Sequence, residues 1–164
     1  MQQIILSHQD IIHKIKRISF QILETFFHEE ELFVAGISGN GFDFAKEIVD
    51  EIKLNSTLKI HLLELKINKK NPYQLIECEI DTEAYKNKCV VLVDDVLHTG
   101  TTLIYGVKFF LETPLKMLKT AILVNRNHKN FPIKADFKGI SLSTSLQNHI
   151  EVVHENNTWN AYIY

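Results

Sequence analysis

Two adjacent carboxylates, Asp94 and Asp95, follow the apolar run VVLV and lead into a loop of small hydroxyl residues. Residues Thr99 to Thr102 stand where a helix is expected to begin, and a helix start offers unpaired backbone N–H groups and the positive end of the helix dipole. Gly100 permits a tight backbone, and the threonine hydroxyls add hydrogen-bond donors. The stretch therefore predicts a site for a phosphate monoester. It is not a Walker A loop, because no lysine follows the glycine.

The two aspartates need a partner other than the phosphate, because a carboxylate repels an anion. They can accept hydrogen bonds from a diol, or hold Mg²⁺ through water. A phosphate site a few residues from a diol-binding carboxylate pair describes a ribose 5-phosphate. The alternative is a helix start with acidic capping residues, which explains one aspartate but hardly two.

The elements that must position these residues alternate along the chain. The apolar runs predict strands over 32–38, 58–67, 89–94 and 118–124. Helices are expected after a capping box at Ser7 and Asp10, over 42–52, and from about 101 to 112, before Pro114. A loop is expected over 95–100. The segment 68–88 is polar with a weak pattern. KINKKNPY is expected to be a mobile loop, and IECEI is a candidate short strand. Shorter β-like segments are expected over 130–164.

This alternation predicts an α/β fold, an open parallel sheet with flanking helices, in a single domain over 1–164. Such sheets bind ligands beyond the carboxyl ends of their strands, which is where the glycine loops 38–41 and 98–102 fall. The first loop also permits a dinucleotide-binding fold, but its spacing is GxxGxG rather than GxGxxG.

The composition and the sequence pattern argue against several classes of protein. The net charge is −2, so no global basic character indicates nucleic acid. Cys78 and Cys89 lack a metal-binding or disulfide-framework spacing and are expected to be reduced thiols. No apolar run approaches the roughly 20 residues of a membrane span. The N-terminus lacks the pattern of a secretory signal, so a cytoplasmic protein is expected.

The motif VVLVDDVLHTGTT resembles the phosphoribosyl pyrophosphate signature of type I phosphoribosyltransferases. The segment VAGISGNGFDFAKEIVDEI stands where that family has its pyrophosphate loop and the following helix. The segment AILVNRNHKNFPIKADFKGISLSTS resembles the C-terminal part of the PyrR family, pyrimidine-operon regulators that also have uracil phosphoribosyltransferase activity. The similarity covers most of the chain and is weakest over 58–88.

The resemblance implies the type I phosphoribosyltransferase fold and transfer of a phosphoribosyl group to a nucleobase, with uracil as the expected base in pyrimidine salvage. Asp94 and Asp95 would hold the ribose hydroxyls and act as catalytic residues. Mg²⁺ would have no direct protein ligand and would sit near them through water, bridging ribose and pyrophosphate. The residues implied to bind phosphoribosyl pyrophosphate are Asp94, Asp95, His98, Thr99, Gly100, Thr101, Thr102, Ser38, Gly39, Asn40 and Gly41.

The chain departs from the family pattern at the pyrophosphate and the base. Loop 38–41 carries no basic side chain, whereas PyrR-like proteins have one there. The loop expected to cover the substrate is short, and Lys69 and Lys70, with Tyr73, are its candidates for catalytic cover; solvated lysines are the alternative. A lysine that reaches Asp94 and Asp95 would favour catalysis.

The candidates for the base pocket are Arg126 and His128, and a polar turn is the alternative interpretation of this segment. Asn125 precedes them where the PyrR-like pattern has an aspartate, so the preference for uracil stays open.

The resemblance also implies a homodimer or a higher homo-oligomer, and it raises RNA as a partner. Leu146 stands where PyrR-like proteins have a basic residue, and the net charge is acidic, so RNA binding is disfavoured. The second functional hypothesis is a regulator that senses phosphoribosyl pyrophosphate or a nucleotide with little or no catalysis.

Overall fold

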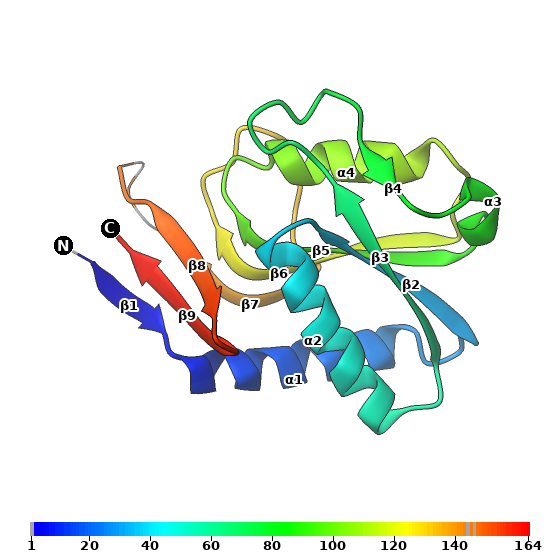
Figure 1. Cartoon of the computed structure of the whole chain (residues 1–164), viewed down its shortest axis with the longest axis horizontal. Helices are drawn as coiled ribbons and strands as arrows, with labels where there is room; N and C mark the ends of the chain where they lie inside the picture. Colours follow the sequence, from blue (N-terminus) through cyan, green and yellow to red (C-terminus); the bar gives the residue numbers. More distant parts are fainter. Residues whose placement is uncertain (1, 144, 146) are drawn as a thin grey trace.

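The computed structural model describes residues 2–143, 145 and 147–164, in two β-sheets with helices around the larger one (Figure 1). The helices and strands, in chain order, are β1 (Gln3–Leu6), α1 (His8–Thr25), β2 (Glu31–Ile37), α2 (Asn40–Asn55), β3 (Lys59–Lys66), β4 (Glu77–Cys78), α3 (Thr82–Tyr85), β5 (Cys89–Leu97), α4 (Thr101–Leu111), β6 (Met117–Arg126), β7 (Phe137–Leu142), β8 (Ile150–Glu155) and β9 (Thr158–Ile163).

The larger sheet has the strand order β4-β3-β2-β5-β6-β7. Its five strands from β3 to β7 are parallel, and only the two-residue β4 pairs antiparallel, with the edge of β3. The central strand β5 is buried along nearly its whole length, because it has neighbours on both sides and helices on both faces. The predicted α/β fold with an open parallel sheet is confirmed.

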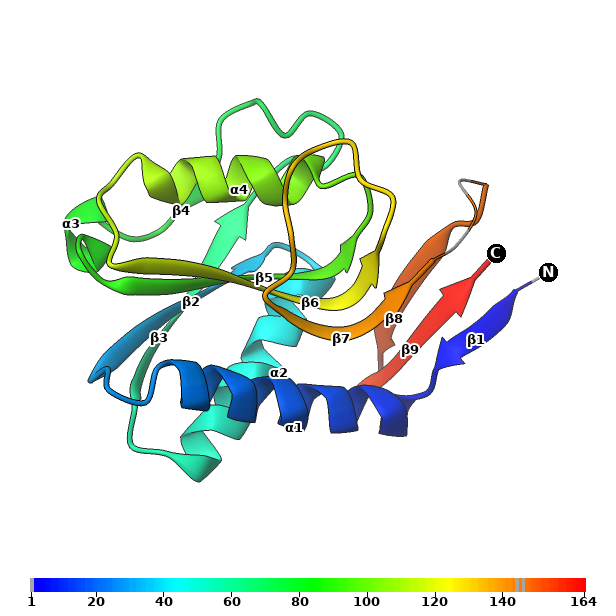
Figure 2. The same ribbon diagram turned by 180° about the vertical axis from the view of Figure 1, so that it is seen from behind.

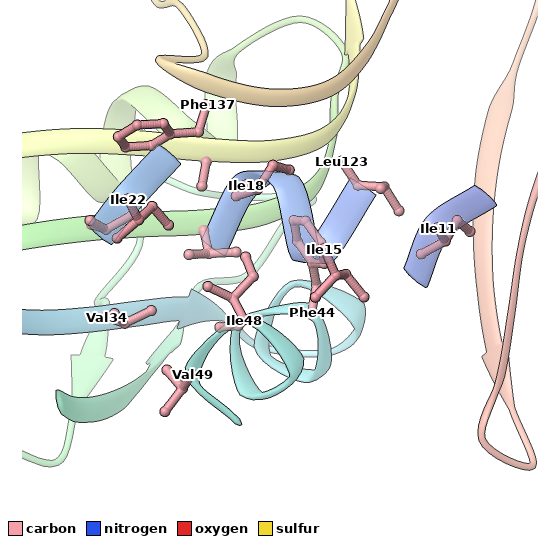
Figure 3. Packing of buried hydrophobic residues seen from close by; sticks show 14 of the residues in the cluster. Ile11, Ile15, Ile18, Ile22, Val34, Phe44, Ile48, Val49, Leu123 and Phe137 are labelled. Carbon is pink, nitrogen blue, oxygen red and sulfur yellow. The ribbon is translucent and has the colours of Figure 1, made fainter. Parts of the chain in front are cut away.

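Helices α1 and α2 cover one face of this sheet and α4 covers the other (Figures 1 and 2). The capping box predicted for α1 is present: the Ser7 amide donates to the Asp10 carboxylate at 2.9 Å, and the Asp10 amide donates to the Ser7 hydroxyl at 3.3 Å. The apolar face of α1 presents residues at helical spacing to α2 and the sheet. Figure 3 shows them: Ile11, Ile15, Ile18 and Ile22 meet Val34, Phe44, Ile48, Val49, Leu123 and Phe137.

Strand β5 is longer than the sequence indicated, which corrects the expected loop over 95–100. It continues to Leu97 because its ladder with β6 continues, pairing Asp94 with Ile122 and Leu97 with Asn125. The loop is therefore only 98–100. Both aspartates belong to the strand, so their backbones are held by the sheet.

The smaller sheet, β1-β9-β8, was not expected as a separate unit. It is antiparallel, and it brings the two ends of the chain together by pairing Gln3 with Ile163. Asn156 and Asn157 have positive φ of 49° and 59° and form the two-residue turn between β8 and β9. The Trp159 side chain of β9 is buried, and its backbone amide donates to His8 Nδ1 at 3.1 Å, which fixes the sheet to the start of α1.

The two cysteines and the lengths of the helices bear on two further expectations. Cys78 and Cys89 are free thiols, as predicted. Within the described residues, no helix has both the length and the apolar character needed to cross a bilayer.

Candidate functional site

A pocket of about 400 Å³ lies at the carboxyl end of β5, where sequence-distant segments meet. This is the position at which parallel α/β sheets bind ligands. Its walls come from the first glycine loop, the segment after β3, the β5–α4 connection and strand β8. The lining residues are Asn40, Lys69, Asp94, Asp95, Val96, Leu97, His98, Thr99, Gly100, Thr101, Thr102, Leu103, Ile150, Glu151 and Val152.

Asp94 and Asp95 are both buried, with 3% and 8% of their surface exposed. Asp94 Oδ1 accepts the Asp95 amide at 3.0 Å, so the pair is held by its own backbone. Gly41 lies against this carboxylate: a Cβ added to it would fall 2.7 Å from Asp94 Oδ1. The second glycine of the first loop is thus needed for the close approach of α2 to the aspartates.

Lys69 reaches over the carboxylate pair, with its Nζ 3.2 Å from Asp94 Oδ1 and 3.5 Å from Asp95 Oδ1. Burial lowers the pKa of Lys69, but the charges of Asp94 and then Asp95 outweigh it, so the net shift is upward and the amine stays charged. Lys70 lies elsewhere: its amide donates to Asn68 Oδ1, and it does not line the pocket. Of the two lysines proposed for catalytic cover, the structure brings only Lys69 to the aspartates.

The carboxyl group of Asp94 is in an unfavourable place for a negative charge. Burial, and next the charge of Asp95, raise its pKa to about 8, although Lys69 opposes the shift. A ligand that offers hydroxyl donors or a cation at this point would stabilise the ionised form.

The turn between β5 and α4 has the geometry expected of an anion site. Gly100 is the N-cap of α4 at φ 86° and ψ −1°, and the first turn of the helix carries no acidic residue. The Thr99 and Thr101 hydroxyls lie 2.8 Å apart, at the mouth of the helix. The Thr99 carbonyl accepts the amides of Asn130 at 2.8 Å and Phe131 at 3.2 Å, so the loop after β6 holds this turn from behind.

The turn between β2 and α2 places its side chains differently. Only Asn40 of the predicted residues 38–41 lines the pocket. The Asn40 Nδ2 donates to the Val152 carbonyl at 2.7 Å, which fastens the start of α2 to strand β8. Asp43, in the first turn of α2, lies 3.1 Å from His154 Nδ1 of β8 and 3.3 Å from Lys46 Nζ. The polar side chains at the start of α2 therefore contact strand β8 and attach the small sheet to the helix.

His98 lines the pocket with both ring nitrogens engaged. Its Nδ1 lies 3.1 Å from an Arg126 guanidinium nitrogen. Because a guanidinium only donates, Nδ1 must accept, and the proton of the neutral ring is on Nε2. Burial, Arg126 and the stacked His149 lower the pKa of His98, while a hydrogen bond to the Ile150 backbone raises it. The net shift is downward, so the ring is neutral.

The residues predicted for the base pocket lie beyond this wall. Arg126 contacts His98 and donates to the Ser145 carbonyl at 3.0 Å, and His128 is exposed; neither lines the pocket of the aspartates. The buried Asn125 donates to Ser141 Oγ at 3.1 Å, and its Oδ1 has no hydrogen-bond partner among the described residues. Leu146, which bears on RNA binding, falls outside the described residues.

Sequence reasoning did not identify the residues that β8 contributes: Ile150, Glu151 and Val152. They come to the pocket through the docking of the small sheet, which no local pattern encodes. The alternation of the segment IEVVHE predicts a strand but not its neighbours.

The donor set of the site fits Mg²⁺ only in part. Carboxylate oxygens are ligands that Mg²⁺ prefers, and it is commonly held by one or two of them together with phosphate oxygens and water. Across residues 2–143, 145 and 147–164, no group of three or more His, Cys, Asp or Glu side chains could hold a metal alone. Asp94 and Asp95 therefore suit a cation that brings its other ligands with it.

The sequence matches the family model described as "Phosphoribosyl transferase domain" over residues 1–156. Three proteins named "Bifunctional protein PyrR" illustrate the similarity. The protein of Haemophilus ducreyi is 29% identical over 163 residues, covering 93% of this chain and 89% of the relative. That of Streptococcus thermophilus is 32% identical over 148 residues, covering 85% and 82%. That of Caldicellulosiruptor bescii is 34% identical over 147 residues, covering 84% and 79%.

Solved structures with a similar fold include a hypoxanthine phosphoribosyl transferase of Trypanosoma cruzi and a hypoxanthine-guanine phosphoribosyltransferase of Bacillus anthracis. The first has a TM-score of 0.77 at 14% identity, covering 96% of this chain and 89% of that one. The second has a TM-score of 0.75 at 18% identity, covering 96% of both chains. At this level of identity the likeness shows the fold alone.

Proposed function

Since the chain belongs to the phosphoribosyl transferase family and is similar in sequence to PyrR proteins, we propose that it transfers the phosphoribosyl group of phosphoribosyl pyrophosphate to a nucleobase, releasing pyrophosphate. One observation carries the proposal: a carboxylate pair, a lysine over it and the hydroxyl-rich start of α4 line a single pocket.

Each half of the ligand has candidate partners in this pocket. The ribose hydroxyls donate to Asp94 and Asp95, and the 5-phosphate accepts hydrogen bonds from the amides and hydroxyls of Thr99 to Thr102. Asp94 and Asp95 would hold Mg²⁺ through water, and the ion would supply positive charge beside the diphosphate. The Asn40 side chain is bonded to the Val152 carbonyl and the Ser38 amide to the Leu65 carbonyl, so the pyrophosphate would meet mainly the backbone N–H groups of residues 39–41.

The reaction is a displacement at the anomeric carbon. A base nitrogen forms the C–N bond with its lone pair, the C–O bond to pyrophosphate breaks with its electrons leaving on oxygen, and the nitrogen loses its proton to solvent. Positive charge develops on the sugar, beside Asp94 and Asp95, and negative charge develops on the leaving group, which Lys69 can approach. The protein acts mainly by positioning and charge neutralisation, with water excluded.

Uracil is the proposed base, supported by the similarity to PyrR proteins over most of the chain. Arg126 and His128 stay candidates for its pocket, although neither lines the site of the aspartates. The purine bases hypoxanthine and guanine are the alternative, because the structural neighbours are named for them.

The second candidate function is a sensor that binds phosphoribosyl pyrophosphate or a nucleotide and turns over weakly or not at all. It is favoured by the first glycine loop, which has no basic side chain and has its asparagine held by β8. Sensing through RNA remains disfavoured by the acidic net charge. Assembly as a homodimer or a higher homo-oligomer and a cytoplasmic location are further predictions of this proposal.

The test is pyrophosphate release from phosphoribosyl pyrophosphate with uracil, hypoxanthine, guanine and adenine in turn, with Mg²⁺ present. Turnover is expected with uracil. Asp95→Asn replaces a charged acceptor of the diol by a neutral amide and should weaken the affinity for phosphoribosyl pyrophosphate about tenfold, since a hydrogen bond to a charged group contributes about 1.5 kcal/mol or more. Binding without turnover on any base would support the sensor, and an unchanged affinity in Asp95→Asn would refute the diol assignment.

A further inference from the structure

The ammonium group of Lys69 stands where the ligand's sugar is proposed to bind. It lies within 3.5 Å of a carboxylate oxygen on each aspartate, and the three side chains line the same pocket. The carboxylates are buried, but the Lys69 side chain is 46% exposed, so it enters the pocket from the solvent side. A cation that reaches in from a polar loop can leave without disturbing the core.

Two partners compete for the same carboxylate oxygens. Ribose hydroxyls need Asp94 and Asp95 as acceptors, and the ammonium group of Lys69 already holds one oxygen of each. A sugar that binds here must therefore displace Lys69 or share its acceptors.

The diphosphate of the substrate is the expected new partner of the displaced Lys69 side chain. The diphosphate of the proposed substrate brings several negative charges to the pocket, and loop 38–41 has no basic side chain to meet them. An ammonium group is a compact cation on a flexible stem, suited to moving between two anions a short distance apart. The segment around it permits such a movement, since the hydrogen bonds given for Lys70 and Asn71 in the described part of the chain are local ones, with Asn68, Tyr73 and Gln74.

We propose that Lys69 exchanges partners on ligand binding: its ammonium group contacts the Asp94 and Asp95 side chains in the empty site and the diphosphate in the loaded site. This inference rests on the proposed function, which supplies the ligand. The lysine opposes the binding of the sugar and favours the binding of the diphosphate, so its net effect depends on which ligand is offered.

The exchange predicts effects of opposite sign on two ligands, measured by calorimetry on the full chain. In Lys69→Met, ribose 5-phosphate should bind about fivefold more tightly, because no partly exposed ion pair has to be broken. Phosphoribosyl pyrophosphate with Mg²⁺ should bind about tenfold more weakly, because a charge-assisted contact is lost. A role limited to local structure would change both affinities in the same direction.

Lys70→Met is the matched control, because the adjacent lysine lies in the same polar loop and does not line the pocket; both affinities should stay within twofold of the unmodified protein. Lys69→Arg keeps the cation and should restore diphosphate binding without improving the binding of ribose 5-phosphate. Weaker binding of both ligands in Lys69→Met, or no change in either, would overturn the exchange while leaving the proposed function intact. If the unmodified protein binds neither ligand, the proposed function fails first.

Discussion

Two turns of the same design stand side by side in this protein, since β2 and β5 are parallel neighbours and each leads through a glycine into a helix. Gly39 caps α2 at φ 90° and Gly100 caps α4 at φ 86°. Among the described residues, neither glycine cap has a side-chain cap hydrogen bond, although the Thr101 amide donates to Thr99 Oγ1 at 3.3 Å. Both helix starts still leave backbone N–H groups for another acceptor.

The turns differ in what surrounds them. A Cβ on Gly100 would clash with the Ile133 side chain, and the Thr99 carbonyl is held by the loop after β6, so the β5–α4 turn is packed into place. A Cβ on Gly39 would meet nothing within 4 Å. The first turn of α4 has hydroxyls and no acid, whereas that of α2 carries Asp43, whose charge disfavours an anion at a helix start.

The comparison shows that a strand–glycine–helix pattern determines the backbone conformation of the turn but not what its side chains contact. At the β5–α4 turn, the donors face the pocket. At the β2–α2 turn, Asn40 and Asp43 face strand β8 and hold the small sheet. Recognition of a ribose phosphate is accordingly better supported by the geometry than a charged clamp on pyrophosphate.

The packing contrast gives the largest expected effect. Gly100→Ala should lower the free energy of unfolding by about 3 kcal/mol, because the new methyl group adds a clash with Ile133 to the strain of a positive φ. Gly39→Ala should lower the free energy of unfolding by only about 1 to 2 kcal/mol, since this substitution introduces the backbone strain without the clash. Denaturant titration of both variants measures the difference. A loss at Gly39 equal to or above that at Gly100 would contradict the packing argument.

The carboxylates of the two regions should respond to pH in opposite directions. The raised pKa of Asp94, about 8, means that between about pH 4 and pH 8 the folded protein holds a proton that the unfolded chain has released. The free energy of unfolding therefore falls as the pH rises through this window. Asp94→Asn should remove the fall and make the metal-free protein more stable at pH 8 by at least about 2 kcal/mol, with no gain at pH 4.

Urea titrations at pH 4, 6 and 8 measure this slope. Asp50→Asn is the control, because Asp50 is an exposed residue of α2 and its replacement should change stability by less than about 0.5 kcal/mol at each pH. A loss of stability in Asp94→Asn at pH 8 would mean that the ion pair with Lys69 outweighs burial of the charge.

The glycine cap and the helix start of the β5–α4 turn could be predicted from the sequence because they are local. The aspartates, the glycine and the threonines follow one another directly, and strong apolar periodicity surrounds them. The same periodicity predicted α1, α2 and α4 and the central strands. The exact end of β5 could not be predicted, since Asp95 to Leu97 look like a loop unless the ladder with β6 is known.

The β2–α2 turn could not be interpreted from the sequence, because the use of its side chains depends on a distant segment. Asn40 is separated from Val152 by 112 residues, and nothing near either position shows that they meet. The small sheet behind this contact pairs the two ends of the chain through a strand of four residues, too short to give a periodic signal. The turn at Asn156 and Asn157 was a usable local sign of the hairpin.

The smallest expected effect tests whether the β2–α2 turn serves the small sheet. Burial raises the pKa of Asp43, but hydrogen bonds from His154 and Lys46 outweigh it, so the net shift is downward. Asp43 thus stabilises the fold above its unfolded pKa of about 3.9, and the contribution is lost as the pH falls through the folded value. Asp43→Asn should cost about 0.5 kcal/mol at pH 7, because the carboxylate is a third exposed and salt screens the pair.

Amide exchange locates this loss, because a contact between α2 and β8 should protect β8 in particular. In Asp43→Asn, exchange should quicken in β8 and β9 and stay unchanged in β5 and β6, in contrast to Gly100→Ala, which should loosen the start of α4. Lys46→Met is the matched control: it removes the other partner of Asp43 and leaves His154 in place, so β8 should keep its protection. Equal exchange in β8 for Asp43→Asn and the unmodified protein would mean that Asn40 alone holds the sheet, and would leave the acid at the start of α2 without a structural reason.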